Sequence, residues 1–253
     1  LAEHHRVIAL DRPGYGYSER PRDRLWTAGA QAAFLHRTLE ALRVENPIVV
    51  GHSWGSIVAT AYGLHVPGAA GGFVLLSGYY FPTRRLDAWV AAAPAIPLVG
   101  DVMRYTVSPF VGDLIAPKVI RKVFEPGAVP RRFAKRFPVG LSLRPWQLRA
   151  SAEDSAFMVP AASAMQDRYG ELEMPVAILT GSDDRIVTPA RQSIRLHHAV
   201  PTSEITVVPG LGHMMHYGAH DEIMAAVTRM AGRIARPAGR SEPLPGAEMV
   251  SAG

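Results

Sequence analysis

Ser53 is the residue of this sequence best placed to act as a nucleophile. It stands in the run from Gly51 to Gly55, directly after the β-branched residues 48–50. A Gly-x-Ser-x-Gly spacing suits a sharp strand-to-helix turn in which the serine backbone is strained and its Oγ projects from the turn. Side chains at positions 51 and 55 are expected to collide there, which explains both glycines. The helix that follows directs the backbone N–H of Trp54 toward a developing oxyanion.

A serine hydroxyl reacts only when a histidine removes its proton and a carboxylate orients that histidine. Residues 175–181 form an apolar run that predicts a buried parallel strand, and Asp183 and Asp184 follow it. Residues 204–209 predict a further strand, which leads through a glycine-rich turn to His213. The chain therefore offers a nucleophile, an acid at 183 or 184 and a base, in the order Ser, Asp, His.

The sequence favours chemistry without a metal or an organic cofactor. It contains no cysteine, which excludes disulfides, thiolate metal sites and a cysteine nucleophile. The histidines at 213, 216 and 220 suggest a metal site at first, but no glutamate lies between His216 and His220, so structural roles are favoured. Gly14 and Gly16 do not start a dinucleotide fingerprint, because Glu19 stands where the third glycine is required. His52 is expected to pack and form a hydrogen bond.

Alternating strands and helices are expected to position these residues, which predicts an α/β fold with a mostly parallel sheet flanked by helices. Thr27 is expected to cap the first helix. The expected strands are 6–11, 48–50, 72–77, 175–181 and 204–209, and the expected helices include 28–43, 189–199 and 219–234.

These features together resemble the α/β-hydrolase fold superfamily, in its serine-nucleophile branch with a helical lid, as in bacterial esterase-like members. Residues 11–18 match the family's D-x-x-G-x-G-x-S turn, and His213 matches its G-x-G-H loop. The resemblance implies that the acid is Asp184, three positions after Gly181, with Asp183 as the fallback.

The resemblance also implies how the chain divides. Residues 1–78 and 171–236 correspond to the hydrolase core, and residues 79–170, rich in proline and aromatic side chains, to an inserted helical lid or cap. The segment is too long for a simple connection. Residues 237–253 are rich in proline and glycine and are expected to be disordered.

Compared with the family, the chain begins at the fourth strand, and three earlier strands are not present in it. Residues 6–11 are therefore expected to lack a neighbouring strand. The His-Gly loop that supplies the family's second oxyanion donor is not in this chain either, which leaves the N–H of Trp54. Loss of one such donor lowers the rate by about 10² to 10³. The compartment stays open: cytoplasmic by default, membrane-anchored if an upstream segment carries a hydrophobic anchor.

Positive charge is concentrated in the expected lid. The chain carries a formal net charge of +5 with 48% hydrophobic residues, and residues 79–170 hold thirteen basic and seven acidic side chains. A solvated helical surface is the favoured interpretation, and attraction to an anionic membrane surface or to an acidic substrate is the alternative. Arg131 and Arg132 would then share a basic face with Lys135 and Arg136. No nucleic-acid-binding module accompanies this charge, so nucleic acid is not expected as a partner.

The function expected from these residues is hydrolysis of a small carboxylic ester through an acyl-enzyme, with Ser53, His213 and Asp184 as the triad. Other chemistries of the same fold stay open: a peptidase of the proline-iminopeptidase type, hydrolysis of a carbon–carbon bond, and perhydrolysis. A binding protein without turnover, or a truncated inactive chain, is the alternative from another class. The oligomeric state is not predicted.

Overall fold

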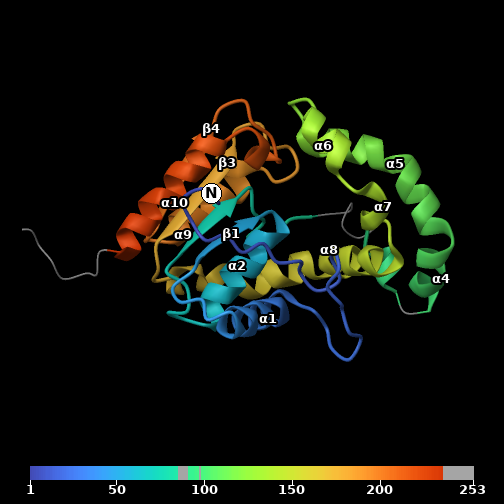
Figure 1. The fold of residues 1–253 in the computed structure, drawn as a ribbon, viewed down its shortest axis with the longest axis horizontal. Helices are drawn as coiled ribbons and strands as arrows, with labels where there is room; N and C mark the ends of the chain where they lie inside the picture. Colours follow the sequence, from blue (N-terminus) through green and yellow to red (C-terminus); the bar gives the residue numbers. More distant parts are fainter. Residues whose placement is uncertain (85–90, 97, 236–253) are drawn as a thin grey trace, which may run out of the picture.

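A parallel sheet forms the centre of the protein, as the sequence predicted, and it has four strands in the described part of the chain. The computed structural model describes residues 1–84, 91–96 and 98–235. The strands lie in the order β1-β2-β3-β4, and every neighbouring pair is parallel (Figure 1). Their bounds are Ile48–His52 for β1, Gly72–Leu76 for β2, Val176–Gly181 for β3 and Ser203–Val208 for β4. The carboxyl ends of β1 and β3 lead directly into the segments that carry Ser53 and Asp184.

Helices connect and cover the strands. The α-helices that lie within the described residues are α1 (Ala28–Ala41), α2 (Trp54–His65), α4 (Val99–Tyr105), α5 (Val107–Phe124), α6 (Arg131–Arg136), α7 (Val139–Ser142), α8 (Pro145–Met165), α9 (Ser193–Ala199) and α10 (His220–Ala235). Short 3-10 helices are η1 (Ala93–Ala95), η2 (Gln166–Glu171), η3 (Pro189–Arg191) and η4 (Met215–Tyr217). The predicted cap of α1 is confirmed, because Thr27 Oγ1 accepts a hydrogen bond from the N–H of Ala30 at 3.3 Å.

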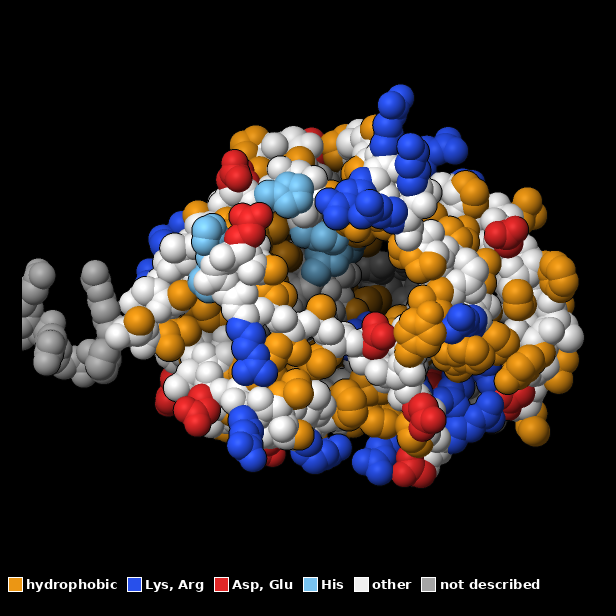
Figure 2. Space-filling model, in the orientation of Figure 1, with side chains coloured by type: hydrophobic (Ala, Val, Ile, Leu, Met, Phe, Trp, Pro, Cys, Tyr) orange, Lys and Arg blue, Asp and Glu red, His pale blue; other side chains and the backbone are white. Residues whose placement is uncertain are grey.

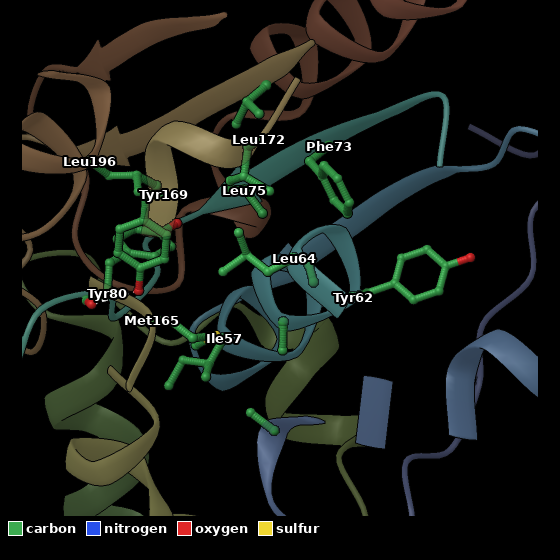
Figure 3. Close-up of a cluster of buried hydrophobic side chains, with 14 of the residues drawn as sticks. Ile57, Tyr62, Leu64, Phe73, Leu75, Tyr80, Met165, Tyr169, Leu172 and Leu196 are labelled. Carbon is green, nitrogen blue, oxygen red and sulfur yellow. Dashed lines mark hydrogen bonds between the residues drawn. The ribbon is translucent and has the colours of Figure 1, made fainter. Parts of the chain in front are cut away.

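The two faces of the sheet bury different sets of side chains. Because side chains alternate along a strand, Phe73 and Leu75 of β2 face one side and Val74 and Leu76 the other. The first face packs against α1, α2, α9 and the end of α8, where Ile57 and other large side chains fill the core (Figure 3). The second face packs against α10. Both central strands are fully buried, which explains their continuous apolar sequences.

Residues 6–11 do not form the expected strand. No backbone hydrogen bond joins them to β1 among the described residues, and β1 is an edge strand of the sheet. A groove of about 810 Å³ lies beside β1, and its lining includes Ile8 and Val50. A lone extended segment without a bonded neighbour cannot satisfy its backbone groups in a ladder, so it stays irregular.

The expected helix over 189–199 is also wrong as a single element. It divides at Gln192 into η3 and α9. The buried side chain of Gln192 accepts hydrogen bonds from the N–H groups of Tyr80 and Phe81 and donates one to the carbonyl of Phe81. The chain turns at Gln192 and bonds the segment after β2, a long-range contact that no local pattern indicates.

Helices α4 to α8 lie between β2 and β3 in the chain, and we call them the helical insertion. Figure 1 shows them arching to one side of the sheet, with α8 running back alongside α2. This insertion occupies the segment that the sequence assigned to a lid. The predicted disorder of residues 237–253 lies outside the described residues.

A buried carboxylate ties the insertion to the loop that precedes α1. Asp154 of α8 accepts hydrogen bonds from Arg12 at 2.7 Å, Tyr15 at 2.9 Å, Gln31 at 3.0 Å and Arg20 at 3.1 Å. Burial and the neighbouring Asp154 carboxylate raise the pKa of Tyr15 to about 12. The loop and α8 therefore behave as one packed unit around a compensated charge.

Candidate active site

Ser53 occupies the turn between β1 and α2. Its φ of 51° and ψ of −117° place it in a strained backbone region, as expected for a serine lifted from a strand-to-helix turn. The N–H of Ser53 donates to the carbonyl of Leu76, which holds the turn against β2. Helix α2 begins at Trp54, so the free N–H groups of its first turn lie beside the serine.

The two glycines of the turn differ in what they permit. A Cβ at Gly51 would lie 2.7 Å from the carbonyl oxygen of Gly55, so glycine is required by space at position 51. A Cβ at Gly55 would meet no atom within 4 Å. The expectation that both positions exclude a side chain is therefore wrong for Gly55, which lines the groove beside β1 and so has open space next to it.

The structure separates the two candidate acids. Asp184 is buried, and its Oδ1 accepts hydrogen bonds from the N–H groups of Ile186 at 2.9 Å and Val187 at 2.8 Å. Asp183 is exposed and accepts from the hydroxyl of Ser182. Only Asp184 of the two reaches the histidine in the described structure, with its Oδ2 2.9 Å from Nδ1 of His213. Asp183 is not brought into the site.

His213 joins the acid to the serine. It lies in the loop after β4, is 5% exposed, and its Nε2 is 3.0 Å from Oγ of Ser53. The three side chains come from segments up to 160 positions apart and form one hydrogen-bonded chain. An imidazole held at Nδ1 by a carboxylate presents Nε2 to the hydroxyl in the tautomer that can accept a proton.

Two further histidines pack beside His213. The Nε2 of His52 donates to the backbone carbonyl of His213 at 2.9 Å, and the ring of His52 lies 4.5 Å from that of His216. Desolvation, together with the neighbouring histidines, lowers the pKa of His52 to about 3 and that of His216 to about 4. The expected packing and hydrogen bonding of His52 are confirmed. The sequence did not predict that His52 would contact the loop of His213, because only its position next to Ser53 pointed to the site.

The described residues hold no group of three or more His, Cys, Asp or Glu side chains arranged for a metal ion. The indole Nε1 of Trp54 is buried without a hydrogen-bond partner in the described structure, and its ring packs against the core on the face of the sheet that includes Phe73 and Leu75. The backbone N–H of Trp54 lies at the start of α2, next to Ser53.

The helical insertion contacts the loop that carries His213. Phe124 at the end of α5 and Phe133 of α6 both pack against Tyr217, with ring centroids 5.3 and 5.6 Å apart. A Cβ at Gly212 would overlap the carbonyl oxygen of Glu125, so the backbone at Gly212 and the backbone at Glu125 approach closely. Figure 2 shows a hollow between the core and the insertion, with histidine side chains on one wall.

A family model described as alpha/beta hydrolase fold matches residues 1–219 of this chain. The chain belongs to the alpha/beta hydrolase fold family. The resemblance seen in the motifs is confirmed by this match, and the parallel sheet of this α/β hydrolase agrees with it.

Relatives and solved structures add detail. The 2-hydroxy-6-oxo-2,4-heptadienoate hydrolase of Pseudomonas putida is 29% identical over 218 residues, which cover 84% of this chain and 73% of that protein. The 2-hydroxymuconate semialdehyde hydrolase of a Pseudomonas species is 28% identical, over 84% of this chain and 71% of that protein. A thermophilic esterase from Thermogutta terrifontis is 18% identical with a TM-score of 0.62, over 89% of this chain and 79% of that one, which shows a shared fold.

Proposed function

We propose that this α/β hydrolase is a serine hydrolase that cleaves a carboxylic ester through an acyl-enzyme. The observation that carries the proposal is the hydrogen-bonded chain from Asp184 through His213 to Ser53, at a strained strand-to-helix turn. Family membership and the two relatives named as hydrolases support the broader class of hydrolase.

In the first half of the reaction, Oγ of Ser53 attacks the acyl carbon while Nε2 of His213 takes the hydroxyl proton. The 3.0 Å separation of these atoms suits direct transfer. Asp184 keeps Nδ1 of His213 protonated and stabilises the imidazolium that forms. The imidazolium then gives its proton to the leaving alkoxide, so an alcohol departs and the acyl group stays on Ser53.

In the second half, water attacks the acyl-enzyme and the same histidine takes its proton. Collapse of the tetrahedral adduct returns that proton to Ser53 and releases a carboxylic acid. In each adduct the negative oxygen is stabilised by the N–H of Trp54 and by the dipole of α2. One such donor is worth about 10² to 10³ in rate.

Hydrolysis of a carbon–carbon bond is the second candidate, because the names of both Pseudomonas relatives describe oxo- or semialdehyde dienoate substrates. Here the bond between a carbonyl carbon and its neighbouring carbon breaks. The neighbouring carbon takes a proton from water, and the hydroxide of that water ends on the carbonyl carbon of the acyl group. The leaving group is a stabilised carbanion rather than an alkoxide, so the pocket must recognise a conjugated acid as well as the carbonyl.

A substrate comparison tests the proposal. We expect turnover of p-nitrophenyl esters of graded acyl length to exceed turnover of 2-hydroxy-6-oxo-2,4-heptadienoate, and Ser53→Ala to abolish it. Ser155→Ala serves as the matched control, because that hydroxyl donates within its own helix to Ser151. Preference for the dienoate would replace the ester proposal by the second candidate. No Ser53-dependent product from either substrate would contradict both.

A further inference from the structure

Helix α5 turns apolar side chains outward. Of its 18 residues only Phe124 is buried, whereas Phe110 and Leu114 are 78% and 81% exposed. Exposed apolar residues on α5 recur at intervals of three and four, the spacing of a helix face that normally packs against a core. Together with neighbours on α4 they form what we call the apolar face: Val99, Val102, Tyr105, Val107, Phe110, Val111, Leu114, Ile115 and Val119.

Basic side chains continue from this face. They lie in the last turns of α5 and on α6, are all exposed, and form no ion pair with any residue in the described part of the chain. We call them the basic end: Lys118, Arg121, Lys122, Arg131, Arg132, Lys135 and Arg136. Asp113 and Glu125 are the two acids between positions 107 and 137, so the local field is strongly positive.

The two features share one side of the molecule. In Figure 2 apolar side chains gather over α4 and α5 along the right edge, and Lys and Arg side chains project at the upper end, over α6. An apolar patch of this kind on a described surface marks an interaction site. Its combination with unpaired positive charge restricts which partner fits.

We propose that the apolar face and the basic end dock onto the surface of an anionic lipid bilayer. The apolar side chains enter the boundary between headgroups and acyl chains, while the basic side chains meet lipid phosphates. None of the helices in the described part of the chain could span a bilayer. The proposal does not depend on the reaction proposed for Ser53.

Charge decides between a membrane and a second copy of this chain. A symmetric dimer through this face would bring both copies of the basic end to one interface, where Asp113 and Glu125 of each copy are too few acids to compensate seven basic side chains. An anionic bilayer instead complements that charge and covers the apolar side chains. The aromatic contact of Phe124 and Phe133 with Tyr217 joins the docking surface to the loop of His213. Docking therefore holds that part of the insertion in place beside the site.

Flotation of the whole chain with lipid vesicles tests the proposal. We expect it to bind vesicles of phosphatidylcholine mixed with phosphatidylglycerol, and to bind pure phosphatidylcholine at least tenfold more weakly. Phe110→Ser with Leu114→Ser should weaken binding to mixed vesicles by tenfold or more, because two apolar side chains no longer enter the bilayer. The matched control replaces Tyr17 and Leu25 with serine, because these two side chains are also exposed but lie outside the apolar face. This control variant should bind the vesicles as the unchanged protein does.

Charge variants test the second half of the surface. Arg131→Gln with Arg132→Gln should lower partitioning roughly thirtyfold, at about 1 kcal/mol for each basic side chain. Arg6→Gln with Arg37→Gln removes the same charge from exposed positions elsewhere and should leave binding nearly unchanged. Equal loss in both pairs would overturn the proposal, as would equal binding to neutral and mixed vesicles. A dimer in lipid-free solution that Phe110→Ser and Leu114→Ser dissolve would assign the face to self-association instead.

Discussion

The carboxylate of Asp184 divides its two oxygens between the loop that carries it and the imidazole of His213. Oδ1 accepts from the backbone N–H groups of Ile186 and Val187, and Oδ2 lies 2.9 Å from Nδ1 of the histidine. The bonds from the loop thus orient the carboxylate independently of its contact with the imidazole. An asparagine can keep the first set of bonds and lose the second.

Asp184→Asn should therefore lower kcat by about 10⁴ while leaving the fold intact, because an amide N–H₂ facing Nδ1 selects the wrong histidine tautomer. Steady-state kinetics on a p-nitrophenyl ester would measure the loss. Asp183→Asn is the matched control, since that side chain is exposed and bonds Ser182. Comparable losses in the two variants would contradict the assignment of the acid.

The glycines of the Ser53 turn should respond differently to alanine. Gly51→Ala places a Cβ against the Gly55 carbonyl, so the turn must shift, at a cost of about 1–3 kcal/mol in the free energy of unfolding and with loss of activity. Gly55→Ala meets open space and should change the free energy of unfolding by less than about 0.5 kcal/mol. Urea unfolding and ester kinetics check both. An equally damaging Gly55→Ala would show that the turn is tighter than described.

Asp154→Asn should destabilise the protein by about 3–5 kcal/mol, because Arg12 and the fully buried Arg20 both lose a carboxylate partner and Arg20 keeps only the partly exposed Glu153. Both carboxylate oxygens accept hydrogen bonds, so an amide N–H₂ faces donors in either orientation. Glu153→Gln, at a side chain 25% exposed, should cost about 1 kcal/mol. Urea unfolding compares the two. Equal small losses would contradict a structural role for Asp154.

Stability should fall as the solution is acidified below the usual histidine pKa. Burial lowers the pKa of His52 to about 3 and of His216 to about 4, against about 6.5 in the unfolded chain. The unfolded state thus binds more protons between these values. The contribution is complete above about pH 6.5 and is lost as the pH falls toward the folded values.

His216→Phe should reduce this dependence, because it removes one of the two buried titrating groups. Guanidinium unfolding at about pH 7 and about pH 5 would measure the change in the free energy of unfolding for each protein. His36→Phe, at a partly exposed histidine on α1, is the control and should keep the dependence. An unchanged dependence in His216→Phe would mean that this imidazole is not held neutral by its surroundings.

Local patterns predicted the parts of this fold that depend on local chemistry. The fully buried strands β2 and β3 were predicted within one residue at either end, because continuous apolar runs have few other structural solutions. Ser53 and His213 were identified from turn motifs, and Asp184 from its distance to Gly181. The geometry brings these three side chains together, and their catalytic roles stay a proposal.

Other features depend on partners far away in the chain. The strand expected over 6–11 needs a bonded neighbour, which sequence periodicity does not report. The break at Gln192 follows from its bonds to Tyr80 and Phe81, more than a hundred positions earlier. The Asp154 network joins residues up to 142 positions apart. The apolar residues of α5 have the same spacing whether the helix turns them toward the core or toward solvent, so only the structure reveals that they are exposed.

Intact-protein mass spectrometry after exposure to a fluorophosphonate tests the central claim most directly, because the reagent labels only an activated serine. We predict a single adduct on the folded protein that is absent from Ser53→Ala, with the same melting temperature for both. Labelling that persists in Ser53→Ala, or no adduct on the folded unchanged protein, would contradict the claim that Asp184, His213 and Ser53 form a working nucleophile.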